Sequence, residues 1–260
     1  MNPFLVGIDL HGTLLNSSEQ FPAEEVNTIG ELLESSKAWL TPVTCTGNDI
    51  TFVRKKLPPR VFSAMKGHVL ETGCTFASVD TESEEIYVDK GVVTARDELE
   101  KLLREQNFPQ VTRFGRRLAT VSLFTASPQA FSLEIASFLK NNQYDDRFTV
   151  TWSSVAVDII PRGFDKLKGL RKAAGNLKII GIADSVNDLP LLKGADYSFA
   201  PANLAPEAER SLRECGIKII TINDSISELQ SATLYKANFK DAAGVAEILK
   251  FLKRIFSFVS

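Results

Sequence analysis

The chain has 260 residues, of which 44% are hydrophobic and 24% are charged, so it is long enough for one large core or two modest ones. Its 30 basic residues are balanced by 32 acidic residues, without the cationic excess that binding to nucleic-acid phosphates requires. The apolar runs are only as long as strands, and we expect no membrane span and no export signal. Three widely spaced cysteines, Cys45, Cys74 and Cys215, favour a reducing cytoplasm over a disulfide framework.

Strands and helices alternate in the first third of the chain. An apolar run that begins at Phe4 stops on Asp9 and turns at once through Gly12. The pattern then predicts a helix over residues 24–36, a buried strand over 38–45, a helix through Lys56 and a short strand near 61–65. Alternation of this kind is typical of a parallel sheet.

The middle of the chain has a different order of elements. The pattern predicts a helix over residues 93–107, strands over 111–116 and 118–124, a helix over 129–140, and strands over 148–152 and 155–160. Such an α-β-β-α-β-β block indicates an antiparallel sheet with helices on one face. We therefore expect a second domain, residues 90–159, inserted into a core domain that consists of residues 1–89 and 160–260.

The alternation resumes after Gly163. Here the pattern predicts a helix over residues 166–174, a strand over 178–183, a helix through Leu192, strands over 197–200 and 217–222, and a helix over 242–256. Both ends of the chain are therefore predicted to form one α/β domain.

The strongest local signal for chemistry follows the strand predicted at 178–183. Asp184, Asn187 and Asp188 come directly after it. Clustered carboxylates destabilise a fold unless a cation compensates them, and oxygen ligands suit Mg²⁺. The alternative is a helix N-terminus, with Ser185 as the capping residue and Asp188 placed favourably for the helix dipole. Capping leaves Asp184 without a role, so the pattern favours a metal site.

Other strand ends carry weaker signals. An aspartate and a glycine after a strand, such as Asp9 and Gly12, also form ordinary turns. Thr46 and Gly47 place a hydroxyl and free backbone N–H groups at the start of a helix, which suits an anionic oxygen. Lys166 alone would be interpreted as a surface lysine, and its interest depends on its position relative to the others.

Taken together, Asp9, Thr46, Lys166, Asp184 and Asp188 occur in an order that resembles the motifs of the haloacid dehalogenase superfamily of phosphohydrolases. The place of the inserted block resembles that of the C2-type cap in the Cof-like and sucrose-phosphatase-like branch of this superfamily. The resemblance covers nearly the whole chain. It implies an α/β fold, with a Rossmann-like parallel-sheet core and an inserted α+β cap domain of the C2 type.

The resemblance also implies roles for individual residues. Asp9 would be the nucleophile that forms an aspartyl-phosphate, Lys166 would offset negative charge, and Thr46 would donate a hydrogen bond to the phosphoryl group. Mg²⁺ would be held by the carboxylate of Asp9, the main-chain carbonyl of His11, Asp184 and, close by, Asp188. The expected contacts with phosphate or substrate are Gly12, Thr46, Gly47, Asn48, Lys66, Lys166 and Asn187.

The chain departs from the family pattern at His11, which stands where the family has a second aspartate. That aspartate protonates the leaving oxygen and later activates water. A histidine can shuttle protons, or its side chain can be incidental and only its carbonyl used. Ala183 and Asn48 are two smaller departures. Lys66 is either a phosphate contact or a solvated turn lysine.

From these features we expect a cytoplasmic, Mg²⁺-dependent phosphatase that acts on a small phosphorylated metabolite, such as a sugar phosphate or a phosphoglycolate-like compound. The alternative is a binding protein with little or no activity, which keeps the phosphate and metal site but has lost proton transfer through His11. We expect a monomer or homodimer with no nucleic-acid or membrane partner. Because specificity depends on side chains of the cap, the sequence does not name the substrate.

Overall fold

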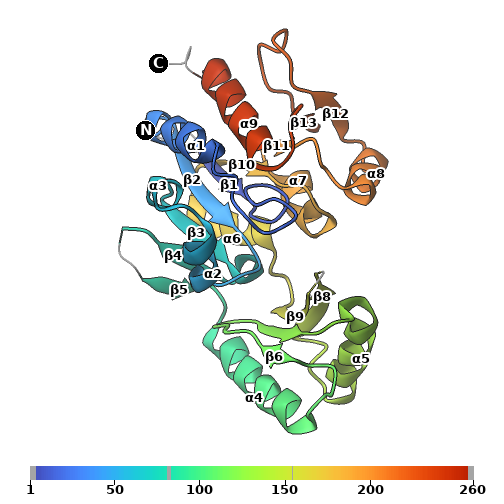
Figure 1. Cartoon of the computed structure of the whole chain (residues 1–260). Coiled ribbons are helices and arrows are strands. Elements are labelled where there is room, and N and C mark those ends of the chain that lie inside the picture. Colours follow the sequence, from blue (N-terminus) through green and yellow to red (C-terminus); the bar gives the residue numbers. More distant parts are fainter. Residues whose placement is uncertain (1–3, 81–82, 154, 257–260) are drawn as a thin grey trace.

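Two separate β-sheets organise the protein in a computed structural model that describes residues 4–80, 83–153 and 155–256 (Figure 1). Within these residues the larger sheet has nine strands in the order β12-β13-β11-β10-β1-β2-β3-β4-β5. All pairings from β12 to β3 are parallel, and β4 and β5 extend this sheet in antiparallel fashion. The strands are β1 (Phe4–Ile8), β2 (Leu40–Cys45), β3 (Gly67–Leu70), β4 (Thr75–Ser78), β5 (Glu84–Ile86), β10 (Lys178–Ile182), β11 (Tyr197–Ala200), β12 (Lys218–Thr221) and β13 (Thr233–Lys236).

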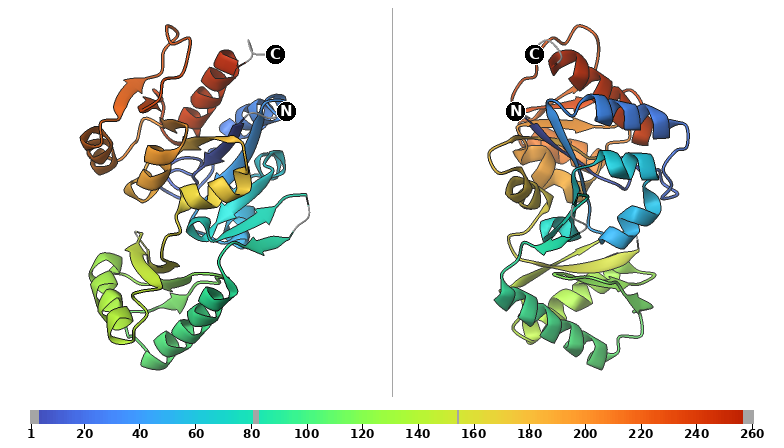
Figure 2. Two further views of the ribbon diagram at one scale, coloured as in Figure 1. Left: turned by 180° about the vertical axis from the view of Figure 1, so that it is seen from behind. Right: turned by 90° about the vertical axis from the view of Figure 1, so that its left-hand side faces the viewer.

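Helices cover both faces of the larger sheet, and Figure 2 shows these layers from two other sides. One face packs against α1 (Glu25–Ser35), α2 (Ile50–Lys56), α3 (Pro59–Ala64) and α9 (Asp241–Phe256), and the other against α6 (Lys166–Ala174), α7 (Leu189–Gly194) and α8 (Pro206–Glu214). Successive strand residues alternate between the two cores, because Leu5 packs with Leu170 of α6 whereas Val6 packs with Leu249 of α9. The predicted parallel-sheet α/β core is confirmed.

The smaller sheet lies entirely in the middle of the chain. Its antiparallel strands β6 (Arg113–Phe114), β7 (Val121–Phe124), β9 (Ala156–Pro161) and β8 (Phe148–Trp152) pair in that order. Two helices, α4 (Lys90–Gln106) and α5 (Pro128–Asn141), bury their apolar faces against one side of this sheet. In Figure 1 both helices lie on the side that is turned away from the larger sheet. The order α-β-β-α-β-β agrees with the sequence prediction, and we call residues 90–159 the insert.

The strand predicted at 61–65 is wrong, because this run is the end of helix α3 (Pro59–Ala64). A proline at the first turn favours a helix start, and Val61 and Ala64, three residues apart, are buried on one side. A short apolar run does not distinguish a strand from a buried helical turn. The next strand of the sheet follows instead at Gly67–Leu70.

Several short elements escaped prediction. Helix α8 is mostly polar and buries Ala208 and Leu212 only, four residues apart, so its apolar stripe is narrow. Strand β13 and the hairpin of β4 and β5 are four residues long or less. None of the helices in the described ranges is long and apolar enough to cross a membrane.

The fold buries a histidine on β3. His68 has no solvent exposure, its Nδ1 lies 2.7 Å from Thr44 Oγ1, and its ring lies 4.6 Å from that of Phe62. Burial, with a smaller contribution from Arg54, lowers the pKa of His68 to about 4. The imidazole is therefore held neutral inside the protein.

This burial predicts a loss of stability in acid. In the window between a folded-state pKa of about 4 and the ordinary value of 6.5, the unfolded chain binds more protons than the folded chain. The stabilising contribution is thus fully present above the unfolded pKa and falls as pH falls towards the folded pKa. Replacing His68 with asparagine should reduce, by roughly 2 kcal/mol, the loss of unfolding free energy between about pH 7.5 and about pH 5. Urea unfolding of both proteins measures this, and an equal acid dependence in the two would contradict it.

Candidate active site

Three neighbouring parallel strands end together at one edge of the larger sheet. Ile8 pairs with Thr44 of β2 and with Ile182 of β10, so the residues that follow these strands lie side by side. The backbone N–H of Asp9 donates to the carbonyl of Ile182 at 2.9 Å. The carboxyl edge of a parallel sheet, where strand order allows helices to diverge, is where such folds place ligands.

A group of carboxylates forms at this edge. Oxygens of Asp9, Asp184 and Asp188 lie within 4.8 Å of one another. Asp9 is 4% exposed and Asp188 is fully buried. Thr13 Oγ1 donates to Asp184 Oδ1 at 3.2 Å, and Ser185 Oγ donates to Asp188 Oδ2 at 2.6 Å. Ser185 therefore holds a carboxylate in place and does not cap the helix with its own side chain.

A buried lysine joins two of these carboxylates. Lys166, the first residue of α6, is 8% exposed, and its Nζ donates to Asp9 Oδ1 at 2.7 Å and to Asp188 Oδ1 at 2.5 Å. The side chain of Asp165 caps this helix by accepting from the N–H of Lys168 at 2.8 Å, which fixes where α6 begins. Burial lowers the pKa of Lys166, but the carboxylates of Asp188 and Asp9 outweigh it and raise the pKa above its usual value.

One lysine does not compensate the whole group. Burial, together with the charge of Asp188, raises the pKa of Asp9 and raises that of Asp184 to about 7. Three carboxylates against one ammonium leave two negative charges when all are ionised. This excess, presented by oxygen donors only, suits a hard divalent cation. The side chains that could hold a metal at this edge are therefore Asp9, Asp184 and Asp188.

The turn after β1 brings a backbone close to Asp184. Gly12 has φ of +70°, and a Cβ there would collide with the carboxylate of Asp184, so only glycine fits. The turn bonds run from the N–H groups of Gly12, Thr13 and Leu15 to the carbonyls of Leu10 and Leu15, and they do not use the carbonyl of His11.

Asn203 is a residue of this site that sequence reasoning missed. Its Nδ2 donates to the carbonyl of Gly12 at 2.7 Å, and its Oδ1 accepts from the N–H of Asp241 at 2.9 Å. It thus ties the turn after β1 to the start of α9. The sequence feature that could have identified Asn203 is its position just after the buried strand β11, at the same edge of the sheet.

The loop after β2 lies beside the carboxylates. Thr46 is 1% exposed and its N–H donates to the carbonyl of Val69 at 2.9 Å. Its hydroxyl oxygen accepts from the backbone N–H of Asn48 at 3.2 Å and from the side-chain amide of Asn48 at 3.3 Å. With two bonds accepted, the hydroxyl hydrogen of Thr46 can be donated elsewhere. Gly47 lies next to Thr72, whose Oγ1 would be 3.4 Å from a Cβ at Gly47.

The structure does not bring Lys66 to this edge, contrary to the sequence prediction. Lys66 precedes β3, whose first residue pairs with Val43 near the middle of β2, so it lies towards the opposite end of the sheet. Its Nζ is 3.3 Å from Asp80 Oδ2 and its side chain is 53% exposed. Asn187 does lie next to the carboxylates, in the turn Val186–Asp188, and is exposed.

The imidazole of His11 lies next to the carboxylate of Glu19. Its Nε2 is 3.4 Å from Glu19 Oε1, and its ring lies 5.2 Å from that of Phe52. Glu19 also pairs with Lys56 at 3.2 Å. Burial lowers the pKa of His11 below its usual value, although Glu19 opposes this. The pairing with Glu19 could not be anticipated, because the two residues are brought together by the loop that follows β1.

Comparison with known proteins identifies the class. A family model for haloacid dehalogenase-like hydrolases matches residues 82–224, more than half of the chain. The chain therefore belongs to this family of hydrolases.

Two phosphatases are similar to the chain in sequence. The phosphoglycolate phosphatase of Aeropyrum pernix is 26% identical over 180 residues, which are 67% of this chain and 71% of that protein. The phosphoglycolate phosphatase of Methanopyrus kandleri is 24% identical over 211 residues, which are 79% of this chain and 87% of that protein.

The fold is similar to that of a sucrose-phosphatase. The X-ray structure of the sucrose-phosphatase from Synechocystis, in complex with sucrose and phosphate, aligns with a TM-score of 0.63. The alignment covers 96% of this chain and 98% of that one, with 16% sequence identity. Likeness at this level of identity concerns the fold alone.

The buried lysine leads to a stability prediction. Replacing Lys166 with methionine removes the cation between two buried carboxylates and should lower the unfolding free energy by about 3 kcal/mol at neutral pH in the presence of a chelator. Adding Asp188→Asn should restore part of this loss, because one uncompensated charge is then removed. Lys168→Met, on the exposed side of the same helix, is the matched control and should change stability by less than about 1 kcal/mol. Equal effects of the two lysine variants would contradict the assignment.

Proposed function

We propose that the protein is a Mg²⁺-dependent phosphomonoesterase that hydrolyses a small phosphorylated metabolite through an aspartyl-phosphate on Asp9. The observation that carries this proposal is the contact of Lys166 Nζ with Asp9 and Asp188, in a group of buried carboxylates at the carboxyl edge of the sheet. Membership of the hydrolase family and similarity to two phosphoglycolate phosphatases support it.

Asp9 is suited to act as the nucleophile. Its carboxylate attacks phosphorus, the bond to the leaving oxygen breaks, and that oxygen takes up a proton. Water then attacks the same phosphorus, and the bond between phosphorus and the Asp9 oxygen breaks. Lys166, held 2.7 Å from Asp9, lies where it can also offset the charge of the phosphoryl oxygens.

The phosphoryl group has further donors nearby. The hydroxyl of Thr46 accepts two bonds from Asn48 and keeps its hydrogen for a phosphoryl oxygen. The backbone N–H of Gly47 and the side chain of Asn187 are further expected contacts, whereas the N–H groups of Gly12 and Asn48 already donate to the carbonyl of Leu15 and to Thr46 Oγ1. Lys66 is left out of this set because it pairs with Asp80 at the far end of β3.

The donor set fits Mg²⁺. Asp9, the main-chain carbonyl of His11 and Asp184 would hold the ion, with Asp188 adjacent. When bound, the ion would offset the charge of the phosphoryl oxygens and of the carboxylates that Lys166 leaves uncompensated.

The insert is suited to be a cap domain that selects the substrate. Its two helices cover one face of its sheet, and Ser122 and Asp158 lie on strands β7 and β9 at positions that alternate with the residues packed under the helices. The second face, which also carries Phe124 and Ile160, is turned towards the larger sheet (Figure 1). On this proposal the core consists of residues 1–89 and 160–260, and polar groups of the cap contact a sugar phosphate or a phosphoglycolate-like compound.

The side chain of His11 determines whether the proposed enzyme hydrolyses its substrate quickly or slowly. The contacts of its ring with Glu19 and Phe52 favour a positioned side chain over an incidental one. A neutral imidazole is nevertheless a poor donor to a leaving alkoxide. A protein that binds a phosphorylated metabolite and hydrolyses it slowly or not at all is therefore the second candidate function.

The first test changes the nucleophile. Asp9→Asn should lower hydrolysis of an aryl phosphate, measured with Mg²⁺, by at least about 10³-fold, because an amide does not attack phosphorus. Asp80→Asn, which alters an exposed carboxylate far from the site, is the control and should keep wild-type activity. Activity of Asp9→Asn close to that of the wild type would rule out the aspartyl-phosphate.

The second test changes the residue that departs from the family pattern. If His11 limits proton transfer, His11→Asp should raise turnover of alkyl phosphates by roughly 10- to 10³-fold, because their leaving groups need a proton. Aryl phosphates, with better leaving groups, should gain much less. No gain on alkyl phosphates, together with full activity of His11→Ala, would show that the imidazole has no part in proton transfer.

A further inference from the structure

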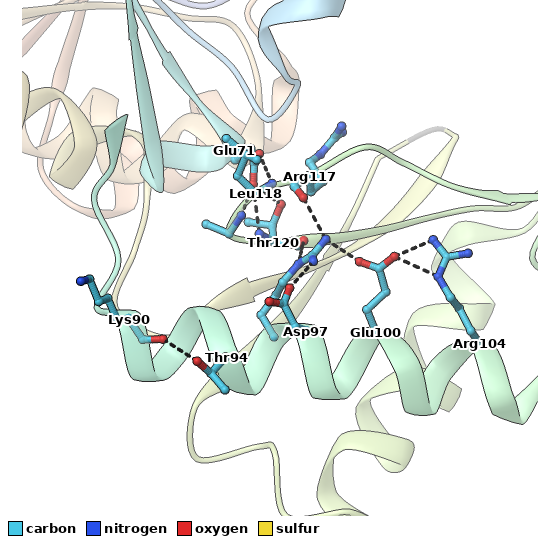
Figure 3. A network of polar contacts seen from close by, with 11 residues as sticks. Glu71, Lys90, Thr94, Asp97, Glu100, Arg104, Arg117, Leu118 and Thr120 are labelled. Atoms are coloured by element: carbon cyan, nitrogen blue, oxygen red, sulfur yellow. Dashed lines mark hydrogen bonds and ion pairs between the residues drawn. The ribbon is translucent and has the colours of Figure 1, made fainter. Parts of the chain in front are cut away.

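Another buried carboxylate, outside the group formed by Asp9, Asp184 and Asp188, binds the insert. Glu71, directly after β3, is 2% exposed. Its Oε1 accepts from the N–H of Leu118 at 2.7 Å, and its Oε2 accepts from the N–H groups of Ala119 at 2.9 Å and Thr120 at 3.0 Å and from the Thr120 hydroxyl at 3.0 Å (Figure 3). Three successive backbone N–H groups of the insert thus converge on one charged side chain of the core, an arrangement that binds anions well.

The same residue touches the candidate phosphate loop. The N–H of Glu71 donates to the carbonyl of Asn48 at 3.2 Å, and the N–H of Thr72 donates to the carbonyl of Thr46 at 3.1 Å. The backbone of this turn is therefore bonded to the loop after β2, whereas the side chain of Glu71 is bonded to the insert.

The backbone around Glu71 is strained. Glu71, Thr72 and Gly73 have φ of 49°, 56° and 94°, a left-handed conformation that side chains disfavour. A Cβ at Gly73 would collide with the carbonyl oxygen of Asp165, so this turn also packs against the start of α6, next to Lys166. Strain of this kind persists only where surrounding contacts enforce it, and it is concentrated at functional positions.

The connection between β6 and β7, which contains residues 118–120, is also bonded to helix α4 of the insert. Arg96 of α4 is 8% exposed and donates to the carbonyls of Thr120 at 2.8 Å and Arg117 at 2.9 Å. Arg96 in turn pairs with Glu100 at 2.5 Å (Figure 3). The connection between β6 and β7 is thus fixed to α4 through its carbonyls and to the core through its N–H groups.

We propose that Glu71 is a positioning residue that holds the insert in one orientation over the candidate active site. This inference rests on the proposed function, because the insert then presents to the substrate the face of its sheet that is not covered by helices, and Glu71 sets the affinity for the part of the substrate that the insert contacts. The chemistry at phosphorus is left to the acidic edge of the sheet. Glu71 therefore acts on KM for metabolites more than on kcat for a small aryl ester.

The chain offers a matched control. Glu84 of β5 also links core and insert, by an ion pair with Arg116 at 3.4 Å, but Arg116 is 56% exposed. Exposed ion pairs contribute little, whereas a buried carboxylate with several donors contributes much more. Glu71→Gln turns an amide group towards at least one of the N–H donors, and Glu84→Gln makes the same chemical change at a half-buried carboxylate whose partner is exposed.

The first measurement is independent of catalysis. Two spin labels report the distance between core and insert in the full chain. One label is attached to Cys215 of the core, which is exposed. The other is attached to the insert through the substitution Leu133→Cys, at a side chain that is 72% exposed. Cys45 and Cys74 are buried, so they do not compete for the label.

The distance distributions decide the positioning role. We expect one narrow distribution in the labelled parent and in Glu84→Gln, and a broad or shifted one in Glu71→Gln. Thr120→Val, which removes a single hydrogen bond to Glu71, should broaden the distribution less and serves if Glu71→Gln does not fold. An unaltered distribution in Glu71→Gln overturns the positioning role whatever the activity.

The second measurement separates binding from chemistry. Glu71→Gln should raise KM for phosphoglycolate by about tenfold or more, while kcat for para-nitrophenyl phosphate stays within about threefold of the wild type. Glu84→Gln should change neither. If the parent hydrolyses neither ester, the proposed function and the effect on KM fail together, while the distance distributions still decide whether Glu71 positions the insert.

Discussion

The pairing of the Lys166 ammonium with Asp9 and Asp188 is the interaction on which the rest of the structure depends. Burial of Asp9 and Asp188 beside the half-buried Asp184 costs stability, and the lysine offsets part of that cost through two short hydrogen bonds. Its position follows from the point at which α6 begins, set by the cap at Asp165. On the proposed function, the remaining negative charge attracts a divalent cation, and the cation and Lys166 together offset the charge of the phosphoryl group that is transferred.

The same edge joins the two sheets of the protein. The turn at Glu71 follows β3 and touches the loop after β2, the start of α6 and the insert. A strained turn with so many fixed contacts is suited to fix the position of the insert and is not suited to act as a hinge. The fold thus places the proposed catalytic residues and the contacts that orient the insert at neighbouring points of the sheet edge.

The sequence predicts those helices and strands in which apolar residues recur at a clear spacing. The strands that precede Asp9, Thr46 and Asp184 are mostly apolar runs, and their ends meet because these strands are parallel. Short or polar elements such as α3, α8 and β13 carry no such period and were misassigned or missed. Contacts between segments far apart in the chain were out of reach as well. Glu19 beside His11, Asn203 beside Gly12 and Glu71 beside the insert depend on loop paths, and Lys66 was misplaced because its position relative to the strand end was not known.

The central claim is that Asp9 carries a phosphoryl group during turnover. Rapid acid quenching during hydrolysis of an aryl phosphate in the presence of Mg²⁺, followed by mass spectrometry of the peptide that contains Asp9, tests it most directly. The account predicts that a fraction of this peptide has gained the mass of one phosphoryl group at Asp9, and that none does so in Asp9→Asn. Turnover with phosphate detected on no residue, or on a residue other than Asp9, would contradict the account.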